Sequence, residues 1–104
     1  MIIAIPASAD KTDALIDERF GRCPFFCFYN NQTASHTFKK NDLKDAPGGV
    51  GLQVAEFLAN NGVSRVFAVE IGPKAEGVLK QMKIKINPVD AGQTVANVIN
   101  MLNH

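Results

Sequence analysis

Cysteine is scarce in this chain of 104 residues, which contains only Cys23 and Cys27. Two cysteines are too few for a disulfide framework. An extended segment between them would hold their Cα atoms about 13 Å apart, which is beyond the reach of a disulfide, so we expect two free thiols. Two thiols also fall short of the four ligands that a protein-bound iron–sulfur cluster ordinarily takes.

An excess of charge of either sign is also lacking. The chain has 11 Lys and Arg residues against 10 Asp and Glu residues, for a formal net charge of +1. This balance gives no bulk field that would attract nucleic acid or a membrane surface, so we expect neither as a partner. Any anion must be held by locally placed charges and backbone N–H groups.

Long hydrophobic runs are absent as well. The apolar start, residues 1–6, is too short for a signal peptide, and no later run approaches the length of a transmembrane helix. We therefore expect a cytoplasmic protein. The length, with 46% hydrophobic and 20% charged residues, predicts one folded domain spanning residues 1–104.

The pattern of apolar and turn residues predicts the element order βββαβαβα. Strands are expected at residues 2–6, 25–29, 34–40, 66–69 and 84–89, with helices starting after residues 48–51, at 72–73 and after Thr94. A meander followed by two strand–helix units predicts an α/β fold with a mixed five-stranded sheet and helices on both faces. Right-handed crossovers would point strands one, three, four and five the same way.

Four connections of this predicted sheet would meet at one of its edges. They comprise residues 7–24, 48–51, 72–73 and 90–92. Ligands of open α/β sheets bind outside the carboxyl ends of the strands, which is where these connections lie. The first connection is long for a compact domain, and such loops are more often functional than idle.

The stretch from Arg19 to Cys23 is the strongest candidate for chemistry in that connection. Arg19 and Arg22 place two permanent positive charges around Gly21, where the backbone can approach a ligand closely. A thiol beside two guanidinium groups should have a depressed pKa, so Cys23 is the candidate metal ligand. Sulfur for a metal and arginine for charge together suit an anionic metal–sulfur group.

A less specific interpretation of the same stretch is equally open. Arg19 and Arg22 would pair with Asp17 and Glu18 on a solvated loop, and Cys23 would fill space.

Two glycine-containing helix starts extend the candidate site. Gly48, Gly49 and Gly51 precede one predicted helix, and Gly72 precedes another, with Lys74 nearby. Backbone N–H groups at a helix start can hold an anion with help from the helix dipole. No Walker motif or dinucleotide fingerprint is present, and glycines that simply permit close packing remain an equal alternative.

The remaining reactive side chains form no pattern that is typical of a catalytic site. Cys27 lies in an apolar run and is expected in the core. His36 and His104 are expected to be bystanders. A hydrolase would need converging carboxylates, and Glu70 and Asp90 on separate turns make a thin case. We therefore expect a protein that is not an enzyme.

Five short motifs, in this order and spacing, carry a resemblance to a known family. They are Ile3-Ala4-Ile5-Pro6, Arg19-Phe20-Gly21-Arg22-Cys23-Pro24-Phe25-Phe26, Gly48-Gly49-Val50-Gly51, Glu70-Ile71-Gly72-Pro73-Lys74-Ala75 and Gly92-Gln93-Thr94-Val95. With these motifs the chain resembles, over nearly its whole length, the dinitrogenase iron–molybdenum cofactor biosynthesis proteins. That family includes nitrogenase-cofactor carriers and the molybdenum–copper orange protein.

The resemblance implies an RNase H-like fold and non-catalytic binding of a metal–sulfur cluster of the iron–molybdenum, iron–sulfur or related molybdenum type, or of its precursor. Proteins that donate or accept the cluster would be its partners. The family commonly has histidine where this chain has Arg19, before Phe20, so imidazole ligation at that position is absent here. Cys23 is then a substitute ligand in this interpretation.

Two functions from different classes follow from the sequence. The preferred one is a carrier of an anionic metal–sulfur cluster, and the alternative is a regulatory or adaptor domain that binds a small anion or a protein without metal. The sequence leaves open which metals are bound, whether the cluster is permanent or in transit, and how many chains share it.

Overall fold

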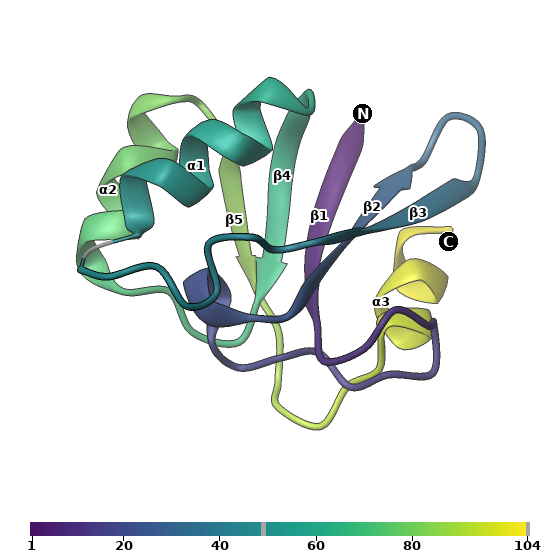
Figure 1. The fold of residues 1–104 in the computed structure, drawn as a ribbon. Helices are drawn as coiled ribbons and strands as arrows, with labels where there is room; N and C mark the ends of the chain where they lie inside the picture. Colours follow the sequence, from purple (N-terminus) through teal and green to yellow (C-terminus); the bar gives the residue numbers. More distant parts are fainter. Residues whose placement is uncertain (49, 104) are drawn as a thin grey trace.

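Five strands form one mixed sheet in the computed structural model, which describes residues 1–48 and 50–103 (Figure 1). In chain order the elements are β1 (Ile2–Ala7), η1 (Phe20–Arg22), β2 (Phe25–Asn30), β3 (Ser35–Lys40), α1 (Gly51–Asn60), β4 (Val63–Ala68), α2 (Pro73–Gln81), β5 (Lys85–Pro88) and α3 (Val95–Leu102). The strand order across the sheet is β3-β2-β1-β4-β5. None of the helices in this described part of the chain is long and apolar enough to cross a membrane.

The strand directions follow the prediction. β1 pairs antiparallel with β2 and β2 antiparallel with β3, whereas β1 pairs parallel with β4 and β4 parallel with β5. The predicted mixed five-stranded α/β sheet is therefore confirmed, with element boundaries that differ by up to three residues. η1, a short 3₁₀ turn within the long first connection, was not predicted.

The central strand β1 continues one residue beyond its predicted end at Pro6. It pairs with β2 along its whole length, but its pairing with β4 covers only Ile2 to Ala4. The backbone carbonyl of Pro6 accepts a hydrogen bond from Asp17 N at 3.0 Å, because the segment after β1 folds back along the end of that strand, where Ile16 bridges to Ala7. A proline is tolerated there since no β4 ladder bond is lost.

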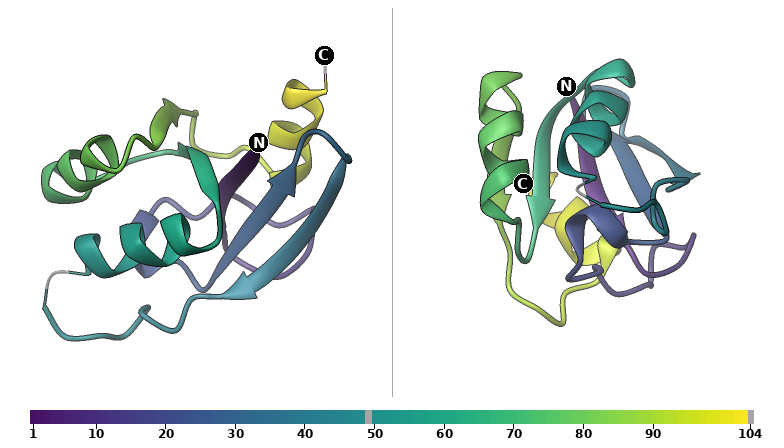
Figure 2. Two further views of the ribbon diagram at one scale, coloured as in Figure 1. Left: turned by 90° about the horizontal axis from the view of Figure 1, so that it is seen from above. Right: turned by 60° about the vertical axis from the view of Figure 1, so that its left-hand side comes forward.

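Alternating side chains of the strands feed two apolar layers, one on each face of the sheet. Ala4, Phe26 and Phe28 pack with α1 and α2 on one face. Ile5 and Tyr29 pack with α3 on the other. Figure 2 shows the arrangement of the helices around the sheet from two further directions. Helices on both faces were predicted and are confirmed.

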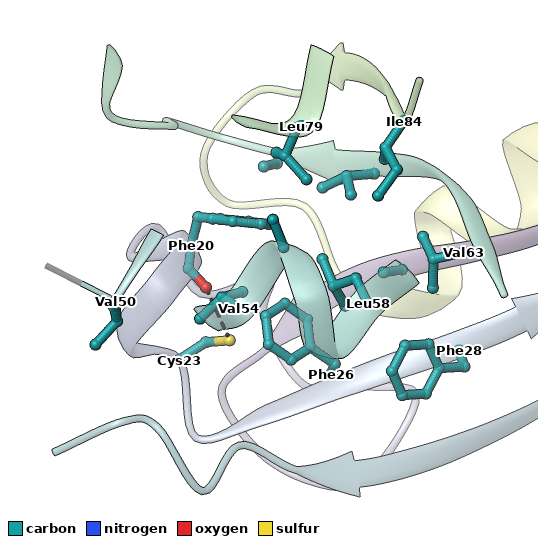
Figure 3. Packing of buried hydrophobic residues seen from close by; sticks show 14 residues of the cluster. Phe20, Cys23, Phe26, Phe28, Val50, Val54, Leu58, Val63, Leu79 and Ile84 are labelled. Carbon is teal, nitrogen blue, oxygen red and sulfur yellow. Dashed lines mark hydrogen bonds between the residues drawn. The ribbon is translucent and has the colours of Figure 1, made fainter. Parts of the chain in front are cut away.

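Aromatic side chains dominate the layer beneath α1. The ring of Phe26 lies 5.8 Å from that of Phe20, 6.4 Å from that of Phe28 and 6.2 Å from that of Phe57. Figure 3 shows Phe20 and Cys23 at one end of this layer. η1 is therefore anchored by burial of its first side chain, which is 4% exposed.

The three α-helices begin differently. Thr94 caps α3, since its hydroxyl oxygen accepts a hydrogen bond from Asn97 N at 3.1 Å, as predicted. No side chain caps the start of α1 at Val50 or of α2 at Gly72. Only the third helix has its first turn satisfied by its own sequence.

Replacement of the α3 cap should lower stability by a small, defined amount. We expect Thr94→Ala to reduce the free energy of unfolding by about 1 kcal/mol, because one helix N–H loses its acceptor. Thr94→Ser keeps the hydroxyl and should stay close to wild type. Urea unfolding followed by circular dichroism measures both, and equal stability of the two variants would contradict the capping role.

Candidate functional site

An open cavity of about 620 Å³ lies where three connections of the sheet meet. Its walls come from η1 and the residues before it, from the start of α1 and from the start of α2. The lining residues are Glu18, Arg19, Phe20, Gly21, Arg22, Val50, Gly51, Glu70, Gly72, Pro73, Lys74 and Ala75. We call this cavity the η1 pocket.

The uncapped starts of both α1 and α2 belong to the η1 pocket. They lie against each other, because a Cβ atom built on Gly51 would come within 3.2 Å of the Ala75 Cα. A larger residue at position 51 would push the two helix starts apart. Helix N-termini carry free N–H groups and partial positive charge, so two of them at one cavity favour an anionic ligand.

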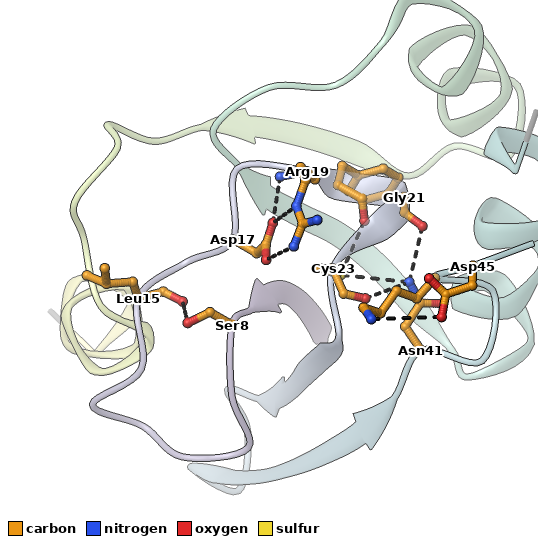
Figure 4. A network of polar contacts seen from close by, with 10 residues as sticks. Ser8, Leu15, Asp17, Arg19, Gly21, Cys23, Asn41 and Asp45 are labelled. Atoms are coloured by element: carbon orange, nitrogen blue, oxygen red, sulfur yellow. Dashed lines mark hydrogen bonds and ion pairs between the residues drawn. The ribbon is translucent and has the colours of Figure 1, made fainter.

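Arg19 lies at the pocket with its guanidinium already paired. Its Nε and one terminal nitrogen donate to the two carboxylate oxygens of Asp17 at 3.1 and 3.0 Å, and its backbone N donates at 2.8 Å (Figure 4). These hydrogen bonds, and then Coulomb attraction, raise the pKa of Arg19. The Arg19 side chain stays 63% exposed, so a ligand can reach it from the solvent side.

Arg22 makes no ion pair with the carboxylates of the described residues. Its guanidinium donates to the backbone carbonyls of Lys44, Ala46 and Gly48 instead. The alternative expected from the sequence, pairing of the two arginines with Asp17 and Glu18, is thus correct for Arg19 with Asp17 and wrong for Arg22.

Asn41 is a buried residue at this site that the sequence did not single out. Its side-chain amide donates to the carbonyls of Gly21 at 3.1 Å and Cys23 at 2.9 Å (Figure 4). Its side-chain oxygen accepts from Leu43 N. The side chain is almost fully covered, with 3% of the residue exposed. An asparagine directly after a strand is a turn signal in sequence, and nothing in that signal indicates burial against another loop.

Negative charge is also present in the η1 pocket. The carboxylates of Glu18 and Glu70 line it together with Lys74. The remaining walls are largely apolar, from Phe20, Val50 and residues 73 and 75. The pocket therefore combines both signs of charge with apolar walls, which suits an anion with a soft, polarisable surface.

Cys23 does not have the character predicted from its neighbours. It is 0% exposed, its Sγ contacts the carbonyl of Phe20 at 3.3 Å, and it packs in the core beneath α1 (Figure 3). Burial, reinforced by the charge of Asp17, raises its pKa to about 12. The predicted depressed pKa is wrong, because burial in the core takes the thiol out of water and Asp17 adds a negative charge nearby.

Cys27 lies in the core as predicted. It is 0% exposed on the α3 side of the sheet, and burial raises its pKa to about 12. Both cysteines are free thiols, also as predicted.

The structure brings together seven of the ten predicted site residues. Those that line the η1 pocket are Arg19, Phe20, Gly21, Arg22, Gly51, Gly72 and Lys74. Cys23 and Gly48 are not among the lining residues, and Gly49 lies outside the described residues. The turn at residues 90–92, expected at the same edge, contributes Asp90 to a separate hollow beside α3.

Metal-ligating side chains do not gather in the part of the chain that the structure describes. No group of three or more His, Cys, Asp or Glu side chains there could hold a metal ion. His36 lies on β3 against Phe38, away from the η1 pocket, and His104 lies outside the described residues. The pocket's donors are N–H groups, guanidinium and ammonium.

These features define a class of small α/β domains in which an open pocket lies between a loop and two helix starts. The chain belongs to the family described as "Dinitrogenase iron-molybdenum cofactor", whose profile matches residues 1–104. The family resemblance predicted from the sequence is confirmed.

The chain is also similar to individual proteins and solved structures. An uncharacterized protein of Methanocaldococcus jannaschii is 32% identical over 89 residues, which are 83% of this chain and 72% of that protein. The apo form of the orange protein from Desulfovibrio gigas has a similar structure, with a TM-score of 0.89 and 29% identity over 95% of this chain and 83% of the other. A putative NifB protein from Thermotoga gives 0.81 and 27%, with coverage of 95% and 84%.

The two buried thiols predict a loss of stability at alkaline pH. The ordinary thiol pKa is 9.0, and both thiols have a folded-state value of about 12. Their contribution is therefore complete below about pH 9 and is lost as pH rises toward 12. We expect a loss of about 1 kcal/mol per thiol at pH 10, measured by urea unfolding at pH 8 and pH 10.

Single variants separate this effect from the titration of other groups. Cys23→Ala and Cys27→Ala each remove one of the two thiols. In each variant, the difference in unfolding free energy between pH 8 and pH 10 should therefore be smaller than in wild type by the contribution of one thiol. A difference as large as that of wild type in both variants would contradict the assignment.

Proposed function

We propose that this chain is a non-catalytic, single-domain carrier that binds an anionic metal–sulfur cluster, or a precursor of one, in the η1 pocket. The observation that carries the proposal is the pair of uncapped helix starts at one cavity, with Arg19 and Lys74 on its walls. The family to which the chain belongs, and its likeness to the orange protein, support a role related to the iron–molybdenum cofactor. An RNase H-like fold and a reducing, cytoplasmic location are part of the proposal.

The donor set of the pocket fits a cluster that brings its own sulfide ligands. N–H groups and cationic side chains can hydrogen-bond to sulfide at the surface of such a cluster, and the apolar walls match its soft exterior. A bare metal ion would find no thiol or imidazole among the lining residues. A direct bond from Cys23 is not part of this proposal, because its thiol is turned into the core.

The openness of the pocket suits delivery rather than storage. Arg19, Gly72 and Lys74 are all exposed, so cargo can enter and leave without unfolding of the walls. Proteins that donate or accept the cluster are the partners that such a carrier requires.

An adaptor that binds a small molecule or a protein without metal is the second candidate. The observation in its favour is that Asp17 already neutralises Arg19, while Glu18 and Glu70 also line the pocket. The net positive charge offered to a ligand is then small.

Titration with tetrathiomolybdate, a soluble thio-anion, tests the carrier function. We expect saturable binding with a shift of the visible absorption bands, and weaker binding by about fivefold in Arg19→Gln and in Lys74→Gln. Lys40→Gln removes the same charge from an exposed position on β3 and should bind like wild type. No binding by anaerobically purified wild-type protein would favour the adaptor function instead.

The carboxylate of Glu70 should oppose the same ligand. We expect Glu70→Gln to bind tetrathiomolybdate about twofold more tightly at low salt, because a like charge leaves the pocket wall. Because Glu70 is exposed to solvent and the pocket is open, salt should screen its repulsion of the anion. The gain in affinity of Glu70→Gln should therefore disappear as the salt concentration is raised. A gain that persists at high salt would show that Glu70 acts through something other than its charge.

A further inference from the structure

Two side chains tie the connection between β3 and α1 to the connection that contains η1. Arg22 donates to the carbonyls of Lys44 at 3.1 Å and Gly48 at 2.8 Å, and also to Ala46. Asn41 donates back to the carbonyls of Gly21 and Cys23 on either side of Arg22. Side chains of each connection thus donate hydrogen bonds to backbone carbonyls of the other, although about twenty residues separate the two connections in sequence.

The start of α1 lies shortly after residues 44–48, the segment whose carbonyls accept the hydrogen bonds of Arg22. Gly48 precedes the N-cap residue Val50 by two positions, and Val50 touches η1. A Cβ atom on Gly21 would lie 3.0 Å from a Val50 methyl carbon. A shift of residues 44–48 relative to η1 would therefore be passed along the chain to the N-cap of α1, two positions beyond Gly48.

The contacts of Arg22 require the shape of its side chain as well as its charge. A planar guanidinium can reach three carbonyls along one segment, whereas an ammonium at the end of a lysine offers a single point. Among the described residues, no carboxylate pairs with Arg22, so these carbonyls are its protein partners. Arg22 also borders the η1 pocket, which makes direct contact with the ligand the competing explanation.

We propose that Arg22 is a positioning residue. Its guanidinium fixes residues 44–48 against η1 and thereby holds the uncapped start of α1 in place to bind the ligand. This inference rests on the proposed function, because it concerns the same pocket. It changes the role predicted from the sequence, in which Arg22 contributed its charge to the cluster.

Affinity for tetrathiomolybdate separates the two roles of Arg22. We expect Arg22→Lys and Arg22→Gln to weaken binding equally, by about fivefold if the loosened pocket is competent about a fifth of the time. At the neighbouring Arg19, where the charge itself acts on the ligand, Arg19→Gln should weaken binding by about fivefold. Lys40→Gln controls for the change in net charge, and all variants are compared in the fully folded range of temperature.

Two outcomes would overturn the inference. If Arg22→Lys binds like wild type while Arg22→Gln is weakened, the charge of Arg22 acts directly on the ligand. If Arg22→Lys and Arg22→Gln both bind like wild type, the hydrogen bonds of Arg22 to residues 44–48 do not position the pocket.

Amide hydrogen exchange tests the same inference without a ligand. The amide of Ala46 donates to the carbonyl of Leu43, and its exchange reports on residues 44–48. The amide of Val54 donates to the carbonyl of Val50, and its exchange reports on the first hydrogen bond of α1. Arg22→Lys should speed their exchange by about tenfold, while amides of β1 and β2 keep their protection. If wild type does not bind the thio-anion, the proposed function fails, and this measurement alone decides: unchanged exchange at both amides would overturn the role of Arg22.

Discussion

The parting of β1 from β4 is the constraint on which the rest of the structure depends. β1 pairs with β2 as far as Ala7, but its parallel ladder with β4 stops at Ala4. Beyond that point the segment after β1 folds back along that strand, so that Ile16 bridges to Ala7 and its N–H donates to the carbonyl of Gln93 before α3. The η1 pocket lies outside the carboxyl ends of these strands, at the position where open α/β sheets bind ligands.

The pocket leaves local helix chemistry incomplete. α3 satisfies its own start through Thr94, whereas α1 and α2 begin without a capping side chain and both begin at the pocket. Such departures from local preference are expected where a protein binds something, because a cap would occupy the N–H groups that the ligand needs. Gly51 lets the starts of α1 and α2 lie in close contact at the pocket.

The chemistry of the η1 pocket differs from that of a site that binds a metal through thiols or imidazoles. The chain belongs to the dinitrogenase iron–molybdenum cofactor family, yet its pocket offers cations and N–H groups in place of thiols or imidazoles. Cys23 and Arg22, adjacent in the loop, both have partners within the protein: the thiol packs under α1, and the guanidinium donates to carbonyls of residues 44, 46 and 48. Of the two arginines, Arg19 has a side chain that stays largely exposed, and Asp17 pairs with it.

The sequence by itself determined the element order, the mixed sheet, the two free thiols and the family, because these depend on local periodicity, turn residues and short motifs. It also located most of the pocket, since residues 19–22 and the glycines at 51 and 72 mark loops at one sheet edge. Only the tertiary structure decided what each side chain does there. Burial raised the pKa of Cys23 where adjacent charges predicted a lower one, and Asn41 and Arg22 found partners about twenty residues away. Contacts at that separation follow from packing between loops, which leaves no periodic trace in a single sequence.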